Sequence, residues 1–428
     1  MKIEFHTLGC KVNQYETQAL REAFERKGIL SANEGEKPDI ILINSCTVTA
    51  ESDRKTRQLL SRVKRDNPDS ITVLTGCMVQ AMGENGEAPL LADVVIGNTD
   101  ISKTVETTLE FIKNKKQIVD VIPHIKNEKF NTPSVTGFAE RTRAYMKIQD
   151  GCERYCTYCI IPTARGVIRS KPIEEIRKEA QMLALNGFAE VVLVGINLSS
   201  YGRDEGIDLC DAVDAVCSAE GIKRVRLGSL EPDHISDNML ARFKNQEKFC
   251  PQFHLSLQSG CDRTLKRMNR HYDTAFYTDL INRIRAIFPD AAITTDIMVG
   301  FAGETEEEFE ESLSYLKNIG FAKSHVFAYS RRKGTVAYGL PNQVTRAEKT
   351  RRSRLMLDAA LDCEERFLIS QIGKTVPVLF ETATAELSKG YTPNYTPVHV
   401  LGKKIEAGTV LNVTITDAFK EFCIGEIK

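Results

Sequence analysis

Short apolar runs alternate with helical patterns along the first 115 residues. Four runs are continuous, which is typical of strands buried on both faces of a parallel sheet. They span residues 3–8, 40–44, 71–75 and 94–97. Between them, apolar positions recur at helical spacing over residues 14–27, 51–65 and 101–113. The alternation predicts an α/β fold, an open doubly wound parallel sheet over residues 1–115 with its functional crevice at the carboxyl ends of the strands.

The same alternation resumes after residues 116–137. This segment lacks steady periodicity and predicts a linker, with Pro123, Asn127, Asn131, Pro133, Ser134 and Gly137. Residues 138–368 contain six strand patterns, at 145–149, 191–195, 224–228, 253–258, 292–298 and 324–329. Six helical patterns follow them, at 173–186, 209–219, 236–245, 275–287, 306–319 and 346–367. Six β/α units are fewer than the eight of a complete barrel, so we expect an open, partial (β/α)6 barrel.

The last sixty residues, 369–428, follow a β pattern. Apolar and polar positions alternate in four segments, which are residues 376–382, 395–400, 408–415 and 422–427. Turns are expected at residues 389–390, 402–403 and 407–408. A small antiparallel β-barrel of the oligonucleotide-binding type fits this length.

The composition limits the cellular context. The chain has 428 residues and a net charge of −1, so any nucleic-acid surface must be local. It has no apolar run of about 18 residues, so we expect no membrane partner. We also expect that the protein does not bind DNA. The start of the chain is too polar for a signal peptide. Twelve cysteines without such a signal point to a reducing compartment, the cytoplasm, and to metal or redox roles.

Three cysteines stand directly after the first expected barrel strand. Cys152, Cys156 and Cys159 have the spacing Cys-x3-Cys-x2-Cys. Three such thiolates can hold three irons of a [4Fe–4S] cube and leave the fourth iron open for chemistry. A structural zinc is the alternative, but zinc prefers four protein ligands and no fourth Cys or His lies nearby in the sequence.

Three further cysteines each follow an expected strand of the first sheet. Cys10, Cys46 and Cys77 come after its first three strands, whose carboxyl ends share one edge. A second three-thiolate cluster is therefore expected there, and three unrelated buried thiols are the alternative. No ligand role is assigned to the other cysteines, which are Cys210, Cys217, Cys250, Cys261, Cys363 and Cys423.

A three-cysteine cluster on a partial β/α barrel resembles the radical S-adenosylmethionine (SAM) enzymes, in which SAM bound to the open iron is cleaved to a 5′-deoxyadenosyl radical. The second triplet and the C-terminal barrel narrow this to a resemblance to the methylthiotransferases, which have a sulfur-supplying cluster and an RNA-binding TRAM domain. The chain is similar to the branch that acts on threonylcarbamoyladenosine beside the tRNA anticodon. The motifs are TLGCKVNQYE (7–16), NSCTVT (44–49), TGC (75–77), LSLQSG (255–260) and TDIMVGFAGET (295–305).

The resemblance implies cofactors, partners and contacts. It implies two [4Fe–4S] clusters, SAM, a tRNA substrate with a modified adenosine, and an electron donor such as flavodoxin or ferredoxin. SAM contacts are expected at the ends of the second to fifth barrel strands, at Gly195, Asn197, Ser229, Glu231, Gln258, Ser259, Arg270, Val299, Gly300 and Phe301. The alternatives are an ordinary strand-end turn at Gly195 and Asn197, and a solvated helix-edge Arg270.

Local basic and aromatic residues are expected to bind RNA. Arg331, Arg332 and Lys333 lie in a loop at the barrel mouth, and Tyr391 and Tyr395 are candidate stacking residues. An ordinary charged surface is the alternative. The expected function is methylthiolation of C2 of threonylcarbamoyladenosine in tRNA. The rivals are methylthiolation of isopentenyladenosine or of a ribosomal-protein aspartate, and a non-catalytic iron–sulfur RNA-binding protein.

Overall fold

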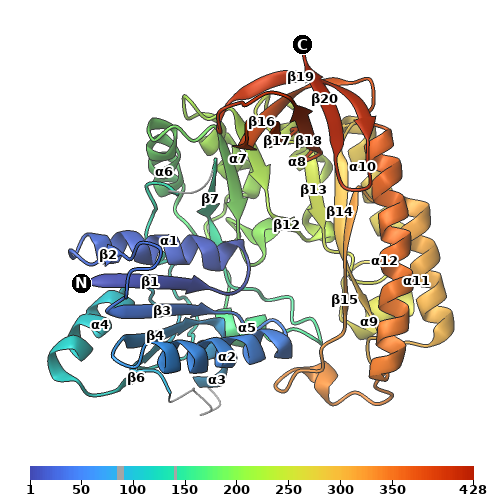
Figure 1. Cartoon of the computed structure of the whole chain (residues 1–428). Coiled ribbons are helices and arrows are strands. Elements are labelled where there is room, and N and C mark those ends of the chain that lie inside the picture. Colours follow the sequence, from blue (N-terminus) through green and yellow to red (C-terminus); the bar gives the residue numbers. More distant parts are fainter. Residues whose placement is uncertain (84–90, 139–141) are drawn as a thin grey trace.

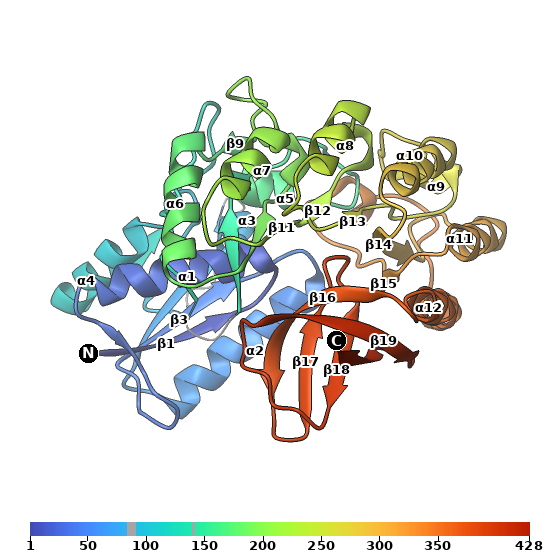
Figure 2. The same cartoon turned by 90° about the horizontal axis from the view of Figure 1, so that it is seen from above.

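The computed structural model describes residues 1–83, 91–138 and 142–428. The chain forms an N-terminal sheet with helices on both faces, a curved central β/α part, and a small C-terminal barrel above the central part (Figure 1). Seen from above, the central part forms an arc, and the N-terminal sheet and the C-terminal barrel lie beside it (Figure 2). Among the described residues, no helix has the length and apolar character needed to cross a membrane.

The N-terminal sheet has six parallel strands in the order β2-β1-β3-β4-β5-β6. Their bounds are β1 Lys2–Thr7, β2 Leu30–Ser31, β3 Ile40–Ser45, β4 Ile71–Gly76, β5 Val94–Ile96 and β6 Ile118–Asp120. The four expected strands are confirmed, and β2 and β6 extend the sheet at its edges. Because β6 pairs with β5, the segment expected to be linker begins as part of the sheet.

Helices cover both faces of this sheet because its central strands are apolar on both sides. Ile40 and Leu42 pack toward α1 and α4, whereas Ile41 and Ile43 pack toward α2 and α3. The helices are α1 Lys11–Glu25, α2 Ala50–Asp66, α3 Cys77–Gly83 and α4 Lys103–Asn114. This arrangement confirms the doubly wound fold.

The central part has six parallel strand positions, the third of which is divided by Gly228. They are β7 Arg143–Lys147, β10 Glu190–Val194, β11 Arg224–Leu227 with β12 Ser229–Leu230, β13 Gln252–Leu255, β14 Ala292–Val299 and β15 Lys323–Ala328. Within the described residues β7 and β15 do not pair with one another, so the barrel is open as expected. A short hairpin, β8 Gln149–Asp150 with β9 Arg169–Ser170, follows β7.

Helices follow the central strands, most of them on the outer face, whereas the short α5 packs against α3. They are α5 Ile161–Arg165, α6 Ile173–Leu185, α7 Leu209–Cys217, α8 Asp237–Lys244, α9 Asp262–Arg267, α10 Thr274–Ile287, α11 Glu306–Ile319 and α12 Arg346–Ile369. Short 3-10 turns lie at Leu198–Ser200, Pro232–His234 and Val336–Tyr338. The long α12 packs against β15 and leads into the C-terminal barrel.

The C-terminal part is a closed five-stranded barrel in the order β16-β17-β18-β20-β19. Its strands are β16 Thr375–Ala383, β17 Leu387–Tyr391, β18 Pro397–Leu401, β19 Val410–Ala418 and β20 Cys423–Ile427. The expected turn at residues 389–390 is wrong, because both residues lie within β17. An added Cβ at Gly390 would stand 2.4 Å from the Leu379 carbonyl oxygen, so this glycine allows close strand packing rather than a turn.

Arginines of the central strands attach the C-terminal barrel. Arg224 donates hydrogen bonds to the carbonyl oxygens of Tyr391 and Pro377, at 2.8 Å and 2.6 Å, and Arg226 donates to Pro393 at 2.9 Å. The buried Glu190 carboxylate lies 2.9 Å from Arg226 and 3.6 Å from Arg224.

Burial alone would raise the pKa of Glu190, but Arg226, Arg143 and Arg224 together lower it, so Glu190 remains a carboxylate between guanidinium groups.

We expect Glu190→Gln to destabilise the protein by about 3 kcal/mol, because it leaves buried guanidinium groups without their counter-charge. Glu174→Gln is the matched control, since the Glu174 side chain is 73% exposed and forms a surface ion pair with Arg177. Urea unfolding of both variants measures the difference. Equal unfolding midpoints would show that Glu190 does not hold this interface.

Candidate functional site

The three N-terminal cysteines meet at one edge of the first sheet. Cys10 precedes α1 directly after β1, Cys46 follows β3, and Cys77 begins α3 directly after β4. Because β1, β3 and β4 are neighbours in a parallel sheet, their carboxyl ends lie together. Burial raises the pKa of the Cys77 thiol to about 12, and the Arg165 guanidinium opposes this rise.

Two asparagines hold the loops that carry these cysteines. The Asn13 side chain donates to the Asn44 side chain at 3.1 Å and to the Ser45 carbonyl at 3.2 Å, and it accepts from the Cys10 thiol at 3.3 Å. Gly9 has φ +123°, and an added Cβ there would lie 2.9 Å from the Cβ of Cys46. The first loop therefore lies directly against the second.

The central triplet lies in the loop between β8 and α5. Cys156 is buried and Cys152 and Cys159 are partly buried. The Cys152 amide donates to the Gly166 carbonyl at 3.0 Å, and the Thr157 amide donates to Met268 at 3.1 Å. These bonds attach the loop at both ends of the triplet.

Gly151 is the residue on which the start of this loop depends. Its φ is +76°, and an added Cβ would lie 1.7 Å from the Val167 carbonyl oxygen. Only glycine combines this left-handed backbone with so close an approach.

Each triplet receives a hydrogen bond from one buried arginine. Arg165 Nε donates to the Cys77 sulfur at 3.1 Å, and an Arg270 guanidinium nitrogen donates to the Cys156 sulfur at 3.3 Å. Hydrogen bonds to ligand sulfurs and nearby positive charge are factors that set the reduction potential of an iron–sulfur cluster. The two sites therefore share one electrostatic feature, a buried arginine that donates to a cysteine sulfur, although they lie in different parts of the chain.

A buried ion network joins the two sites. Arg165 pairs with Glu16 of α1, and it contacts Asp150 of β8 at 3.3 Å. Lys147 lies 2.7 Å from Glu16 and 2.6 Å from Asp150. Burial alone would raise the pKa of Asp150, but Lys147 and Arg165 lower it well below its usual range. The network stays charged and connects the N-terminal sheet to the central triplet.

The donor sets fit iron–sulfur clusters. Among the described residues, no three His, Cys, Asp or Glu side chains are arranged to hold a single metal ion. A [4Fe–4S] cube binds each thiolate through a different iron, so its ligands spread more widely than those of one ion. Three grouped thiols with an arginine N–H on one sulfur suit such a group, and the ligand assignment remains a prediction.

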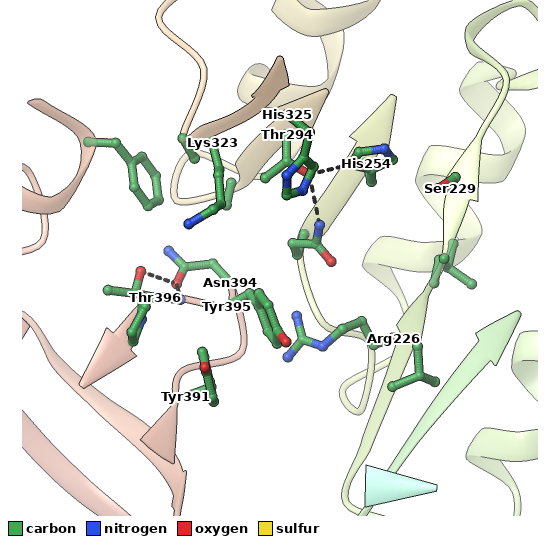
Figure 3. A pocket seen from close by; sticks show the side chains of 18 of the residues that line it. Arg226, Ser229, His254, Thr294, Lys323, His325, Tyr391, Asn394, Tyr395 and Thr396 are labelled. Carbon is green, nitrogen blue, oxygen red and sulfur yellow. Dashed lines mark hydrogen bonds between the residues drawn. The ribbon is translucent and has the colours of Figure 1, made fainter. Parts of the chain in front are cut away.

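A cavity of about 470 Å³ lies between the inner face of the central strands and the C-terminal barrel. Arg226, His254, Thr294 and His325 face it from the strands, and Tyr395 faces it from the C-terminal barrel (Figure 3). Lys11 of α1 also lines it. The cavity is thus bounded by all three parts of the chain, and its volume suits a ligand of nucleoside size.

Residues 146–316 match the Radical SAM superfamily, and residues 2–97 match the Uncharacterized protein family UPF0004. The Threonylcarbamoyladenosine tRNA methylthiotransferase MtaB of Bacillus subtilis is 35% identical over 425 residues, which is 97% of this chain and 94% of that protein. The Aquifex aeolicus protein of the same name is 35% identical over 415 residues, 97% of this chain and 100% of its own length. The chain belongs to the radical SAM methylthiotransferase family.

Further comparisons agree with this family. The tRNA-2-methylthio-N(6)-dimethylallyladenosine synthase of Pelotomaculum thermopropionicum is 34% identical over 392 residues, 89% of this chain and 86% of that protein. The radical SAM methyltransferase TsrM from Kitasatospora setae has a TM-score of 0.56 with 11% identity, covering 78% of this chain and 76% of its own, which shows a shared fold alone. The family implies SAM and a [4Fe–4S] cluster.

In this radical SAM methylthiotransferase, two residues expected to contact SAM have buried polar atoms that find no partner among the residues that the structure describes. These are Asn197 Nδ2 and Gln258 Oε1. Gln149 positions Asn197, because Gln149 Oε1 accepts a hydrogen bond from the Asn197 backbone amide at 2.7 Å. The same oxygen would lie 2.8 Å from a Cβ added at Gly195. Ser259 is buried and accepts from the Cys261 amide, whereas Ser229 lines the cavity. Unpartnered buried polar atoms fit a polar ligand.

Other expected SAM contacts are engaged within the chain. Arg270 pairs with Glu231 at 2.5 Å and also binds Tyr272 and Cys156, so it is not a solvated helix-edge residue. The Gly300 amide donates to Glu304 at 2.6 Å.

The Lys349 side chain lies beside Gly300, since an added Cβ there would lie 2.4 Å from Lys349 Cγ. Val299 and Phe301 are buried at the end of β14.

The residues expected to bind RNA divide into two groups. Arg331 and Lys333 are exposed beside a cavity of about 440 Å³ between α2, α3 and the loop after β15. Arg332 instead is buried, 2.8 Å from Asp53, and also binds Thr47. The expectation that Arg332 faces RNA is therefore corrected, because its charge is needed by Asp53 of the first domain.

Tyr391 and Tyr395 stack on each other in the wall of the cavity of about 470 Å³. Their ring centroids are 4.6 Å apart, and Arg143 lies over both rings at 5.1 Å and 4.9 Å. Arg226 lies over Tyr395 at 4.7 Å. Arg143 and Arg226 lie over these rings, and both tyrosines line the cavity of about 470 Å³, so their contact with RNA stays a prediction. The spare cysteines are all buried.

We expect Gly151→Ala to destabilise the central part by about 3 kcal/mol, because strain and a backbone clash add. Gly187→Ala is the matched control, since Gly187 has φ +85° with no atom within 4 Å of an added Cβ, and strain alone costs about 1 kcal/mol. Urea unfolding and iron content after anaerobic reconstitution measure the effects. Equal losses in both variants would contradict a special role for Gly151.

Proposed function

We propose that this protein replaces the C2–H of N6-threonylcarbamoyladenosine beside the tRNA anticodon with a methylthio group. The observation that carries the proposal is the near full-length similarity to two proteins named for this nucleoside. Two cysteine triplets joined by one ion network support it, because the reaction needs both a radical and a sulfur source.

Each triplet would have its own role. Cys152, Cys156 and Cys159 would hold the cluster that binds SAM, and Cys10, Cys46 and Cys77 a second [4Fe–4S] cluster that carries the sulfur. When bound, the first cluster and SAM supply the radical that takes the C2 hydrogen, and SAM also supplies the methyl group.

The chain's own residues orient and seclude these groups. Asn197 and Gln258 would bind polar groups of SAM through their unpartnered atoms. Tyr158 packs edge-on to Phe301, with centroids 6.3 Å apart, and would help to shield the central triplet from water. We place the protein in the cytoplasm, with tRNA as its substrate and a one-electron donor such as flavodoxin or ferredoxin as its partner.

A second candidate is the same reaction on dimethylallyladenosine of tRNA, because a synthase named for that nucleoside is 34% identical over 392 residues. Nucleoside analysis of tRNA from a strain that lacks the gene separates the two. We expect loss of methylthiolated threonylcarbamoyladenosine, accumulation of its unmethylthiolated form, and unchanged dimethylallyl nucleosides. Loss of the methylthiolated dimethylallyl nucleoside instead would make the second candidate correct.

The two triplets should have separable roles. We expect the triple variant Cys10→Ala, Cys46→Ala, Cys77→Ala to retain about half of the iron and to cleave SAM when reduced, yet to form no methylthiolated nucleoside. The reverse triple variant at Cys152, Cys156 and Cys159 should also lose about half of the iron, but it should not cleave SAM. Product formation by the first variant, measured by mass spectrometry, would show that sulfur does not pass through the N-terminal site.

Arg331 and Lys333 should contribute to tRNA binding through phosphate contacts. We expect the double variant Arg331→Ala, Lys333→Ala to weaken binding and to reduce the slope of log affinity against log salt by about 1 to 2. The control is Lys2→Ala, Lys37→Ala, which removes two charges at the amino ends of β1 and β3. An unchanged salt slope for the first variant would place the RNA surface elsewhere.

A further inference from the structure

The cavity between the three parts has more basic than acidic groups in its wall. Lys11, Arg143, Arg226 and Lys323 line it, against the two carboxylates of Asp296 and Glu364. A pocket wall with surplus positive charge favours an anionic group on its ligand. The charge of the lining therefore favours a ligand with an anionic group, in addition to the ligand size that the cavity volume indicates.

Most of these charges are already compensated. Arg143 lies 2.5 Å from Glu381, Arg226 lies 2.9 Å from Glu190, and Lys323 lies 2.9 Å from Glu364. Asp296 lies 3.3 Å from His254.

Lys11 differs from these residues. Within the part of the chain that the structure describes, its ammonium group forms neither a hydrogen bond nor an ion pair, and its side chain is accessible from the cavity. It is the first residue of α1 and directly follows Cys10. One uncompensated cation therefore lies in the cavity wall, beside the cysteine expected to bind the sulfur-carrying cluster.

We propose that Lys11 binds the carboxylate of the threonylcarbamoyl group and so selects this nucleoside. The inference rests on the proposed function. The cavity volume of about 470 Å³ accommodates a modified nucleoside, and Cys10 next to Lys11 places the substituent close to the sulfur source. An ammonium group beside a carboxylate forms a charge-assisted hydrogen bond, which is stronger than a neutral one.

The same residue would reject a dimethylallyl substituent. An apolar group against Lys11 leaves the ammonium group desolvated and unpaired, which costs more than the loss of a favourable contact. Sites built around one polar partner discriminate strongly against analogues that lack it. Lys11 would therefore be a specificity-determining residue that separates the two candidate substrates.

The test uses reconstituted holoenzyme with anticodon stem-loop RNAs. One RNA carries threonylcarbamoyladenosine and a second carries its carboxyl methyl ester, which keeps the shape and removes the charge. We expect the wild type to prefer the free acid in kcat/KM, and Lys11→Met to reduce kcat/KM for the free acid roughly 10- to 100-fold while changing the ester little. Lys11→Arg, which keeps the charge, should retain most of the preference.

Several outcomes would overturn the proposal. Equal losses of Lys11→Met on both RNAs, in kcat/KM and in equilibrium binding, would mean that Lys11 contacts an RNA phosphate or supports the fold. The control Lys323→Met removes a compensated cation of the same cavity, and an equal collapse of the acid-to-ester ratio there would assign the selectivity to general cavity charge. If the wild type modified only dimethylallyl RNA, the proposed function itself would fail, which is a different result from loss of the ratio.

Discussion

The charged side chains buried between the N-terminal sheet and the central part form ion pairs, and these pairs fix the distance between the two cysteine triplets. Arg165 and Lys147 share the carboxylates of Glu16 and Asp150 in a region without solvent. A buried ion that loses its partner costs about 3–5 kcal/mol, so the two parts cannot separate without a large penalty. Arg332 with Asp53 adds a second attachment at the opposite end of the barrel mouth. Chemistry that takes place between the triplets therefore has a rigid frame.

The fold was largely predictable because its signals are local. Buried parallel strands have continuous apolar runs in the sequence, and the expected positions match β1, β3, β4 and β5 closely. The misses have physical reasons: β2 and β6 are too short for a pattern, and Gly390 gave a turn signal although cross-strand packing requires a glycine there. The positions of the cysteines after successive strands were predictable for the same reason, whereas their role as cluster ligands stays a prediction.

The rest of the site depends on tertiary partners, which a sequence does not display. Arg332 stands among basic neighbours, and only the fold places Asp53 against it. Tyr391 and Tyr395 carry the composition of a stacking surface, yet Arg143 and Arg226 of the barrel cover their faces. Arg165 lies six residues after Cys159, and nothing in that spacing reveals that it donates to Cys77, 88 residues away. The charged residue types in the sequence identified candidate binding residues, and their burial and partners in the fold show which of them are engaged within the protein.

The pairing of residues across the interface also constrains how this architecture can be rearranged. Glu16 of α1 and Asp53 of α2 belong to the N-terminal part, whereas Arg165 and Arg332 belong to the central part. A chimera that joins the first domain of one relative to the barrel of another must transfer these residues as matched pairs. Otherwise each half brings an unbalanced charge into a sealed contact. The two halves therefore form one unit, because the hydrophobic core of the central part also contains Val12, Tyr15 and Ala19 of α1.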